Sequence, residues 1–185
     1  GSASIGLSGS YLLDASGSNE LAILIHTRPR PHFMALGTLA RVSPAGGAPR
    51  EVLENVQDAA WSPDGSKLAV VHVVGNRYRL EYPIGNVLYE STGWITHMRI
   101  SPKGDRIAFL DHTVFPDDRG SVVAVDLRGR ARTLSSGWGT AQGLAWSPSG
   151  DEVWVSAARD GSIRALYAVS LEGRLRAVAT LPGSE

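Results

Sequence analysis

Apolar residues occur along the chain in short runs, and turn residues separate one run from the next. Glu152–Ala157 is rich in Val and Trp, and Ala165–Ser170 alternates as a half-buried strand does. Glu172-Gly173 then predicts a turn into a further strand at Arg174–Thr180. Helices would instead show apolar residues three and four positions apart. The pattern therefore predicts strands.

A ten-residue segment recurs and sets the period of the chain. Trp61–Val70 reads Trp-Ser-Pro-Asp-Gly-Ser-Lys-Leu-Ala-Val, with relatives at Ile100–Phe109 and Trp146–Val155 and a decayed copy at Asp14–Ile23. Intervals of 47, 39 and 46 residues separate its equivalent apolar positions, Leu21, Leu68, Ile107 and Val153. Glycine turns recur independently at intervals of 38, 44 and 44 residues, at Gly47, Gly85, Gly129 and Gly173. Periods of about 40–45 residues built from strands are typical of propeller blades.

The repeats predict an all-β protein, a β-propeller of four-stranded antiparallel blades with about sixteen strands. We expect four blades, at residues 3–56, 57–91, 92–136 and 137–182. Closed propellers have about four to eight blades, so four is the low end of the range. The opening Gly1-Ser2 resembles an expression scar. We therefore expect the chain to be a fragment of a larger ring.

The recurrent Ser-Pro-x-Gly element is interpreted as structural. Proline sets the backbone for the second position of a turn, and glycine tolerates the positive φ that often follows. The large apolar residue just before the turn is expected to pack between neighbouring blades. The expected turn residues are Pro63, Gly65, Pro102, Gly104, Pro148 and Gly150.

The Trp61–Val70 motif resembles the repeat of TolB-like, or WD-like, β-propellers, and the resemblance covers nearly the whole chain. Such blades occur in periplasmic TolB, in prolyl-oligopeptidase-type hydrolases and in bacterial membrane-anchored serine/threonine kinases. Gly37–Val42 and Ala45–Val56 are most similar to the first blade of the kinase-linked propellers. The resemblance implies a bacterial sensor segment on the extracytoplasmic, or periplasmic, side of a membrane.

Composition and motifs exclude several classes of function. Basic and acidic residues number 18 each, a balance that argues against a nucleic-acid partner. No apolar run approaches a membrane span, and the absence of cysteine excludes a disulfide scaffold. Kinase motifs and a Gly-x-Ser-x-Gly elbow in register are absent. We expect no catalytic residues, no cofactor and no metal, although a parent chain could carry a kinase or hydrolase domain.

A few residues still leave a metal or cation site open. His26, His72 and His112 fall at the ends of second strands and could converge, but ordinary loop histidines are the favoured interpretation. The adjacent Asp117 and Asp118 could hold a cation or could simply be solvated on a turn.

The best candidate for binding is the face that carries the longer loops. The loop expected at residues 26–36 contains Arg28, Arg30, His32 and Phe33, and the third blade's loop contains Phe115. The connections between blades add two tryptophans that we expect to be exposed, although they could merely cover blade ends. First strands line the channel of a propeller and open on this face. The candidate binding residues are Trp94, Trp138, Gln57, Asp58, Thr96, His97, Gln142, Arg28, Arg30 and Phe115.

The favoured function is a non-catalytic scaffold that binds a protein, peptide or small ligand through this face, as the sensor segment of a bacterial receptor kinase. Exposed aromatic residues with arginine nearby suit a protein or peptide partner. One alternative is the gating propeller of a prolyl-oligopeptidase-like hydrolase. Another is a purely structural or assembly module, in which open blade edges pair two copies into a homodimer.

Overall fold

The computed structural model describes residues 8–31, 34–161 and 163–179, and these form strands joined by turns and loops. The 15 strands of this part of the chain are β1 (Tyr11–Ala15), β2 (Leu21–Arg30), β3 (Met34–Val42), β4 (Arg50–Trp61), β5 (Leu68–Val74), β6 (Arg77–Glu81), β7 (Val87–Ser91), β8 (Trp94–Ile100), β9 (Arg106–His112), β10 (Gly120–Asp126), β11 (Ala131–Trp138), β12 (Thr140–Trp146), β13 (Glu152–Ala158), β14 (Ala165–Ser170) and β15 (Leu175–Ala179).

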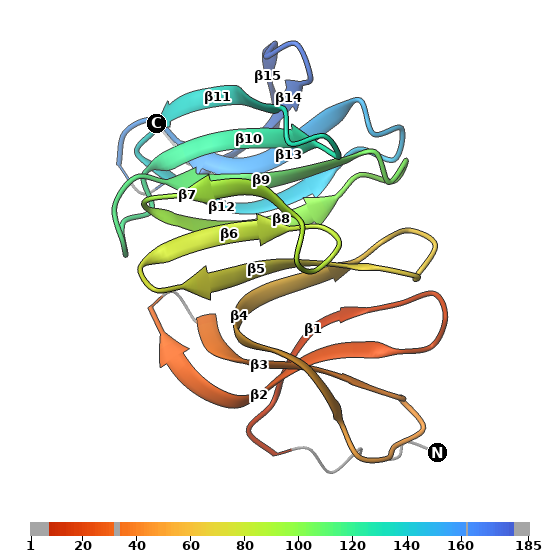
Figure 1. Ribbon diagram of the computed structural model, residues 1–185. Coiled ribbons are helices and arrows are strands. Elements are labelled where there is room, and N and C mark those ends of the chain that lie inside the picture. The colour runs from red at the N-terminus through yellow and green to blue at the C-terminus, as the bar shows by residue number, and fades with distance from the viewer. Residues whose placement is uncertain (1–7, 32–33, 162, 180–185) are drawn as a thin grey trace.

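The strands form three antiparallel sheets, in which four blades can be recognised (Figure 1). Sheets β8–β11 and β12–β15 are single four-stranded blades, whereas β1–β7 form one continuous sheet. Strand β4 makes that sheet continuous, because Arg50–Leu53 pair with β3 and Val56–Trp61 pair with β5. Asn55, at φ 56°, lies between these halves. The prediction of an all-β propeller of four-stranded blades is confirmed.

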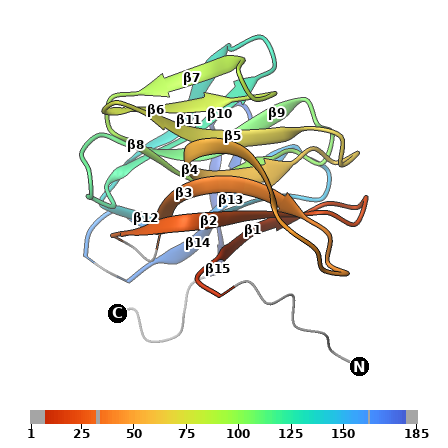
Figure 2. The same ribbon diagram turned by 60° about the horizontal axis from the view of Figure 1, so that its bottom comes forward.

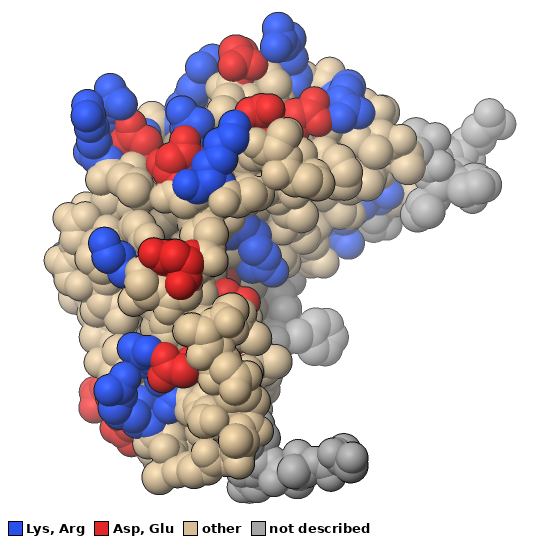
Figure 3. Space-filling view, turned by 90° about the vertical axis from the view of Figure 1, so that its right-hand side faces the viewer, with Lys and Arg blue, Asp and Glu red and all other residues tan. Residues whose placement is uncertain are grey.

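The blades follow one another around an arc (Figures 1 and 2). Their innermost strands pack in sequence: β1 against β4, β4 against β8, and β8 against β12. Strands β1 and β12, which would meet in a closed four-blade ring, are not among the described elements in extensive contact. Figure 3 shows the arc hollowed on one side, with basic and acidic side chains interspersed over the visible face.

Apolar side chains fill the spaces between blades. Each wholly buried Leu, Val or Phe contributes about 1.5–3 kcal/mol, so these interfaces hold the arc together. The first interface includes Leu24, Leu39, Trp61 and Val70; the second includes Leu80, Ile95, Met98 and Phe109; the third includes Leu110, Trp138, Leu144 and Val155.

The Ser-Pro-x-Gly elements form tight turns that stack from blade to blade. Gly104 N–H donates to the Ser101 carbonyl oxygen at 2.8 Å, and the residue adopts φ 70°. A Cβ atom on Gly104 would lie 3.5 Å from the ring of Pro63 in the preceding turn. Gly65 and Gly150 occupy the same position in their own turns, at φ 69° and 72°. The motif residues thus lie where the turn needs a left-handed backbone.

The loop expected at residues 26–36 is instead largely a strand hairpin. Strand β2 continues to Arg30 and β3 begins at Met34, with Arg28 paired to Leu36. The register shifts after Ile25 because His26 adopts φ 51°, and this bulge lets the strands continue pairing beyond it. The expected residues His32 and Phe33 lie outside the described residues.

No helix among the described residues is long and apolar enough to span a membrane.

We predict that Gly104→Ala lowers the free energy of unfolding by about 1–2 kcal/mol, because an L-residue is strained at φ 70° although space for the methyl group exists. Gly17→Ala is the matched control, since Gly17 has neither a positive φ nor an atom within 4 Å of the added Cβ. Urea denaturation measures both variants. Equal stability of the two would show that the turn does not require glycine.

Candidate functional site

The innermost strand of each blade carries a bulge, and the four bulges lie within two residues of one level. Register shifts lie between Leu12 and Asp14 in β1, Val56 and Asp58 in β4, Thr96 and Arg99 in β8, and Gln142 and Leu144 in β12. A bulge leaves a residue out of the ladder and re-aims nearby side chains. Equivalent positions in the four strands are found by counting back from the last paired residue of each strand. Four residues back lie Tyr11, Gln57, Thr96 and Gln142, and three residues back lie Leu12, Asp58, His97 and Gly143.

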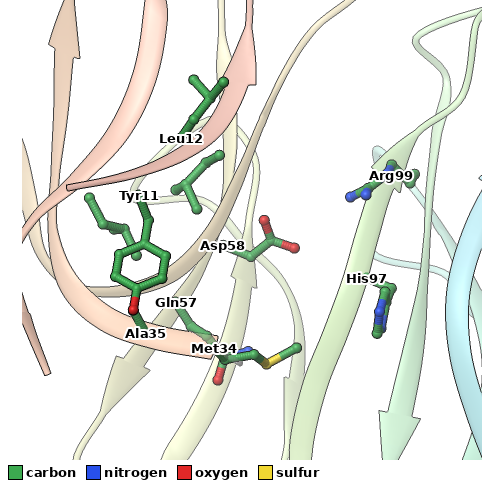
Figure 4. Close-up of a pocket in the computed structure, with 10 residues that line it drawn as sticks. Tyr11, Leu12, Met34, Ala35, Gln57, Asp58, His97 and Arg99 are labelled. Atoms are coloured by element: carbon green, nitrogen blue, oxygen red, sulfur yellow. The ribbon is translucent and has the colours of Figure 1, made fainter. Parts of the chain in front are cut away.

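Side chains at this level line two cavities that share Met34 and His97. We call the two cavities together the funnel. The larger has a volume of about 210 Å³ (Figure 4), and it is lined by Tyr11, Leu12, Leu13, Leu24, Met34, Ala35, Gln57, Asp58, His97 and Arg99. The smaller, of about 50 Å³, is lined by Met34, Trp94, Thr96, His97, His112, Asp118, Ala141 and Gln142. Six expected binding residues from three blades therefore meet at one place: Gln57, Asp58, Trp94, Thr96, His97 and Gln142.

The β2–β3 hairpin reaches from the first blade to the third blade beside the funnel. Met34, at the start of β3, lines both cavities. The guanidinium carbon of Arg30 lies 5.6 Å from the centre of the Phe115 ring, in cation–π geometry. Phe115 in turn meets Trp94 edge-on at 5.5 Å. Arg30 and Phe115 are thus brought together beside the funnel.

A chain of hydrogen bonds fixes the protons of two histidines. His112 Nδ1 lies 3.2 Å from the Arg119 carbonyl oxygen, which can only accept, so Nδ1 carries the proton and Nε2 accepts. The Thr96 hydroxyl then donates to His112 Nε2 at 2.8 Å. Since that hydroxyl has one proton, Thr96 Oγ1 must accept from His97 Nδ1 at 2.9 Å. Neutral His97 therefore presents Nε2 to the funnel as an acceptor.

Both histidines are held neutral. Burial lowers the pKa of His97 to about 4, and the charge of Arg99 acts in the same direction. Burial also lowers the pKa of His112, against the opposing effect of the Arg119 carbonyl. The hydrogen-bonded chain consequently keeps one proton arrangement at neutral pH.

Asp58 and Arg99 point toward each other across the larger cavity (Figure 4). Burial raises the pKa of Asp58 to about 6, although the Arg99 charge and the N–H of Ala59 oppose that rise. Arg99 donates Nη1–H to the Met98 carbonyl oxygen at 2.7 Å. No ion pair between Asp58 and Arg99 is formed within the described residues, so a ligand could lie between them.

Trp94 and Trp138 are buried, with exposed fractions of 1% and 2%, and the expectation of exposed tryptophans is wrong. Trp94 packs at 4.7 Å against the ring of His112 and donates Nε1–H to the Asp117 carbonyl oxygen. The Arg159 guanidinium covers Trp138 at 4.2 Å. Contacts from other parts of the fold thus bury both rings, while Phe115 remains 38% exposed.

The remaining candidates lie apart from the funnel or are already engaged. Arg28 donates to the side chain of Asn55 at 2.9 Å on the exposed part of the hairpin. Asp117 binds the Arg119 guanidinium, and Asp118 accepts from Gln142 and from Arg164. Within the described residues, no group of three or more His, Asp or Glu side chains could hold a metal ion.

Several funnel residues were not identified from the sequence, among them Tyr11, Leu12 and Arg99. Tyr11 and Leu12 are the first-blade equivalents of Gln57 and Asp58. The repeat reveals this equivalence only when the alignment allows for the shorter turn of the first blade. No sequence signal marks Arg99, because its place depends on the bulge in β8.

We predict that long-range ¹⁵N NMR at pH 7 shows His97 and His112 protonated on Nδ1. Thr96→Val keeps the side-chain shape but removes the hydroxyl that joins the rings. The His97 signal should therefore change toward an Nε2–H or mixed tautomer in the variant. A His97 tautomer that does not respond to this substitution would contradict the proposed proton arrangement.

Opposite pH effects on stability are predicted for His97 and Asp58. Below about pH 6.5 His97 is protonated in the unfolded chain, while the fold keeps it neutral down to about pH 4. The contribution of His97 to the free energy of unfolding therefore decreases as the pH is lowered from about 6.5 to about 4. The fold instead protonates Asp58 below about pH 6, so stability rises as pH falls from there toward 4.

Relative to the unsubstituted protein, His97→Gly should therefore become more stable between pH 7 and pH 4.5, and Asp58→Asn less stable. Each change should be on the order of 1 kcal/mol. Urea denaturation at both pH values measures the two differences, and parallel changes in the two variants would refute the assignment.

Three solved structures show what the fold resembles. TolB from Acinetobacter baumannii is 18% identical, with a TM-score of 0.67 over 90% of this chain and 43% of its own. An oligogalacturonate lyase in complex with manganese is 16% identical, with a TM-score of 0.64 over 96% of this chain and 54% of its own. A puromycin-hydrolyzing peptidase from Mycobacterium tuberculosis is 18% identical, with a TM-score of 0.61 over 90% and 31%.

No protein-family model matches the chain, and no curated protein matches it in sequence. The chain spans between 31% and 54% of the length of these three proteins. Identities below 20% support a shared fold and nothing more specific. The chain is a propeller scaffold whose structural neighbours are TolB-like propeller proteins.

Proposed function

We propose that the chain is a non-catalytic propeller module that binds a protein, peptide or small ligand at the funnel. The observation that carries the proposal is the convergence there of polar side chains from three blades, each held in one orientation by the protein's own hydrogen bonds. Side chains ordered before binding lose little conformational freedom when a ligand arrives. No Ser or Cys is among the residues that line the two cavities.

Residues 37–56 support placing this module in the extracytoplasmic sensor half of a bacterial receptor kinase, because they resemble the first blade of such propellers. In that setting the funnel would bind a signal outside the cytoplasm. Figure 3 shows charges of both signs interspersed on one face. Such a surface suits a specific partner with a matching charge pattern better than it suits a partner of uniform charge.

A second candidate is the gating propeller of a prolyl-oligopeptidase-like hydrolase. The structural similarity to a peptidase favours it. In the complete gene, a hydrolase half with a Gly-x-Ser-x-Gly elbow would favour this candidate, and a kinase with a membrane span would favour the sensor. A structural module that assembles through exposed outer strands such as β15 is a third candidate.

Ligand-observed and ¹H–¹⁵N NMR with a mixed library of short peptides and small polar molecules tests the proposed function. Bound members should shift the signals of Gln57, Thr96, His97 and Gln142, because these groups line the funnel. The signals of exposed residues far from it, such as Arg128 on the β10–β11 turn, provide the internal control. Shifts confined to other faces would contradict the funnel as the binding site.

A further inference from the structure

The side-chain atoms that Gln57, Gln142 and His97 leave free in the funnel are all acceptors. Gln57 donates Nε2–H to the Ile95 carbonyl oxygen at 2.7 Å, and Gln142 donates Nε2–H to the Asp118 carboxylate at 2.9 Å. Carbonyl and carboxylate oxygens only accept, so neither amide can be turned over. Each glutamine consequently has Oε1 left for a ligand, and no described residue donates to it.

His97 and Asp58 add two more acceptors. His97 uses Nδ1–H toward Thr96 and leaves Nε2 with a lone pair. Asp58 accepts from the backbone N–H groups of Ala59 and Met98, and its carboxylate keeps further lone pairs for a ligand. The funnel thus offers acceptors on four side chains from β4, β8 and β12, two of which, Asp58 and His97, belong to the larger cavity alongside Gln57.

Donors are scarce in the same place. Arg99 and the hydroxyl of Tyr11 are the side-chain donors that line the larger cavity, and Arg99 already gives one N–H to the Met98 carbonyl oxygen. In the smaller cavity, the Thr96 hydroxyl proton and the His112 Nδ1 proton are both used inside the protein. A ligand that brings further acceptors would leave most of these atoms unpaired, which is costly in a partly buried site.

We propose that the funnel binds a donor-only cationic group, the guanidinium of an arginine or the ammonium of a lysine side chain on a partner peptide. A guanidinium carries five N–H donors and no acceptor, and an ammonium carries three donors. Such a head group complements the acceptors without any change in their orientation. This inference rests on the proposed function, since it names the ligand class of the same funnel.

The charges around the funnel define the role of Arg99. Asp118 is paired with Arg164 at 3.4 Å, while Asp58 faces Arg99 and His97 is neutral. A cationic ligand would therefore be attracted by Asp58 and repelled by Arg99. An anionic ligand would experience the opposite forces, so removing the Arg99 charge distinguishes the two classes of ligand.

The probes are N-acetyl-arginine methylamide, its lysine counterpart, and the citrulline and glutamate analogues, with affinities measured by NMR titration of the intact chain. Citrulline matches arginine in shape but replaces one NH2 group, with its two N–H donors, by a carbonyl acceptor and removes the charge. We expect the arginine and lysine probes to shift the funnel signals and to bind at least about tenfold more tightly than the citrulline and glutamate probes. The reason is that hydrogen bonds to charged groups are the stronger ones.

Two variants and a matched control locate the contact. His97→Gly removes one acceptor, and Gly143 shows that glycine suits the equivalent position of the fourth blade, at φ 77° against 53° for His97. Arginine binding should weaken about tenfold. His26→Gly is the control, because His26 is an exposed histidine, also at positive φ (51°), outside the funnel. Arg99→Gln should strengthen arginine binding several-fold.

Each outcome bears on one of the two proposals. Binding at the funnel with equal affinity for arginine and citrulline, or weaker arginine binding after Arg99→Gln, would overturn the donor-only inference and leave the binding function intact. Equal losses in His97→Gly and His26→Gly would also overturn it. A funnel that responds to neither these probes nor the mixed library would overturn the proposed function itself.

Discussion

The bulge in each innermost strand allows one run of residues to serve both the blade and the channel. On one side of the bulge, residues such as Trp61 and Leu144 pack in the interfaces between blades. At the bulges, Gln57 and His97 leave the ladder, and together with Asp58 they line the funnel. Without that shift in register, the alternation of side chains would place the polar groups against an apolar neighbour, where burial is costly. The funnel therefore depends on the bulges.

The sequence was sufficient to predict the blades because their signals are local. Ser-Pro-x-Gly turns and short apolar runs depend on neighbouring residues, and the period follows from their recurrence. Aligning the repeats also brought Gln57, Thr96 and Gln142 to one level. The first blade is harder to align, because its turn lacks the motif's proline and it is Asn19, at φ 65°, that adopts the left-handed conformation there. The repeat therefore does not align Tyr11 with Gln57.

The exposure of the tryptophans could not be predicted in this way. Trp94 is buried by Phe115 and by the segment that contains Asp117, and Trp138 is covered by Arg159. These partners follow their tryptophans by about twenty residues, in loops whose course has no periodic pattern. The proton arrangement of His97 was likewise beyond the sequence, since it requires the distance from Thr96 to His112.

The continuity of β4 has a mechanical consequence. The first two blades are joined within one sheet through β4, so we expect them to move together. No strand crosses from β7 to β8 or from β11 to β12, and in those places side-chain packing and short connections join the sheets. We therefore expect flexing of the arc to be concentrated at these two places, which act as hinges. The first hinge separates Asp58 from His97 and Arg99, so a molecule held between these groups would fix the angle at which the arc opens.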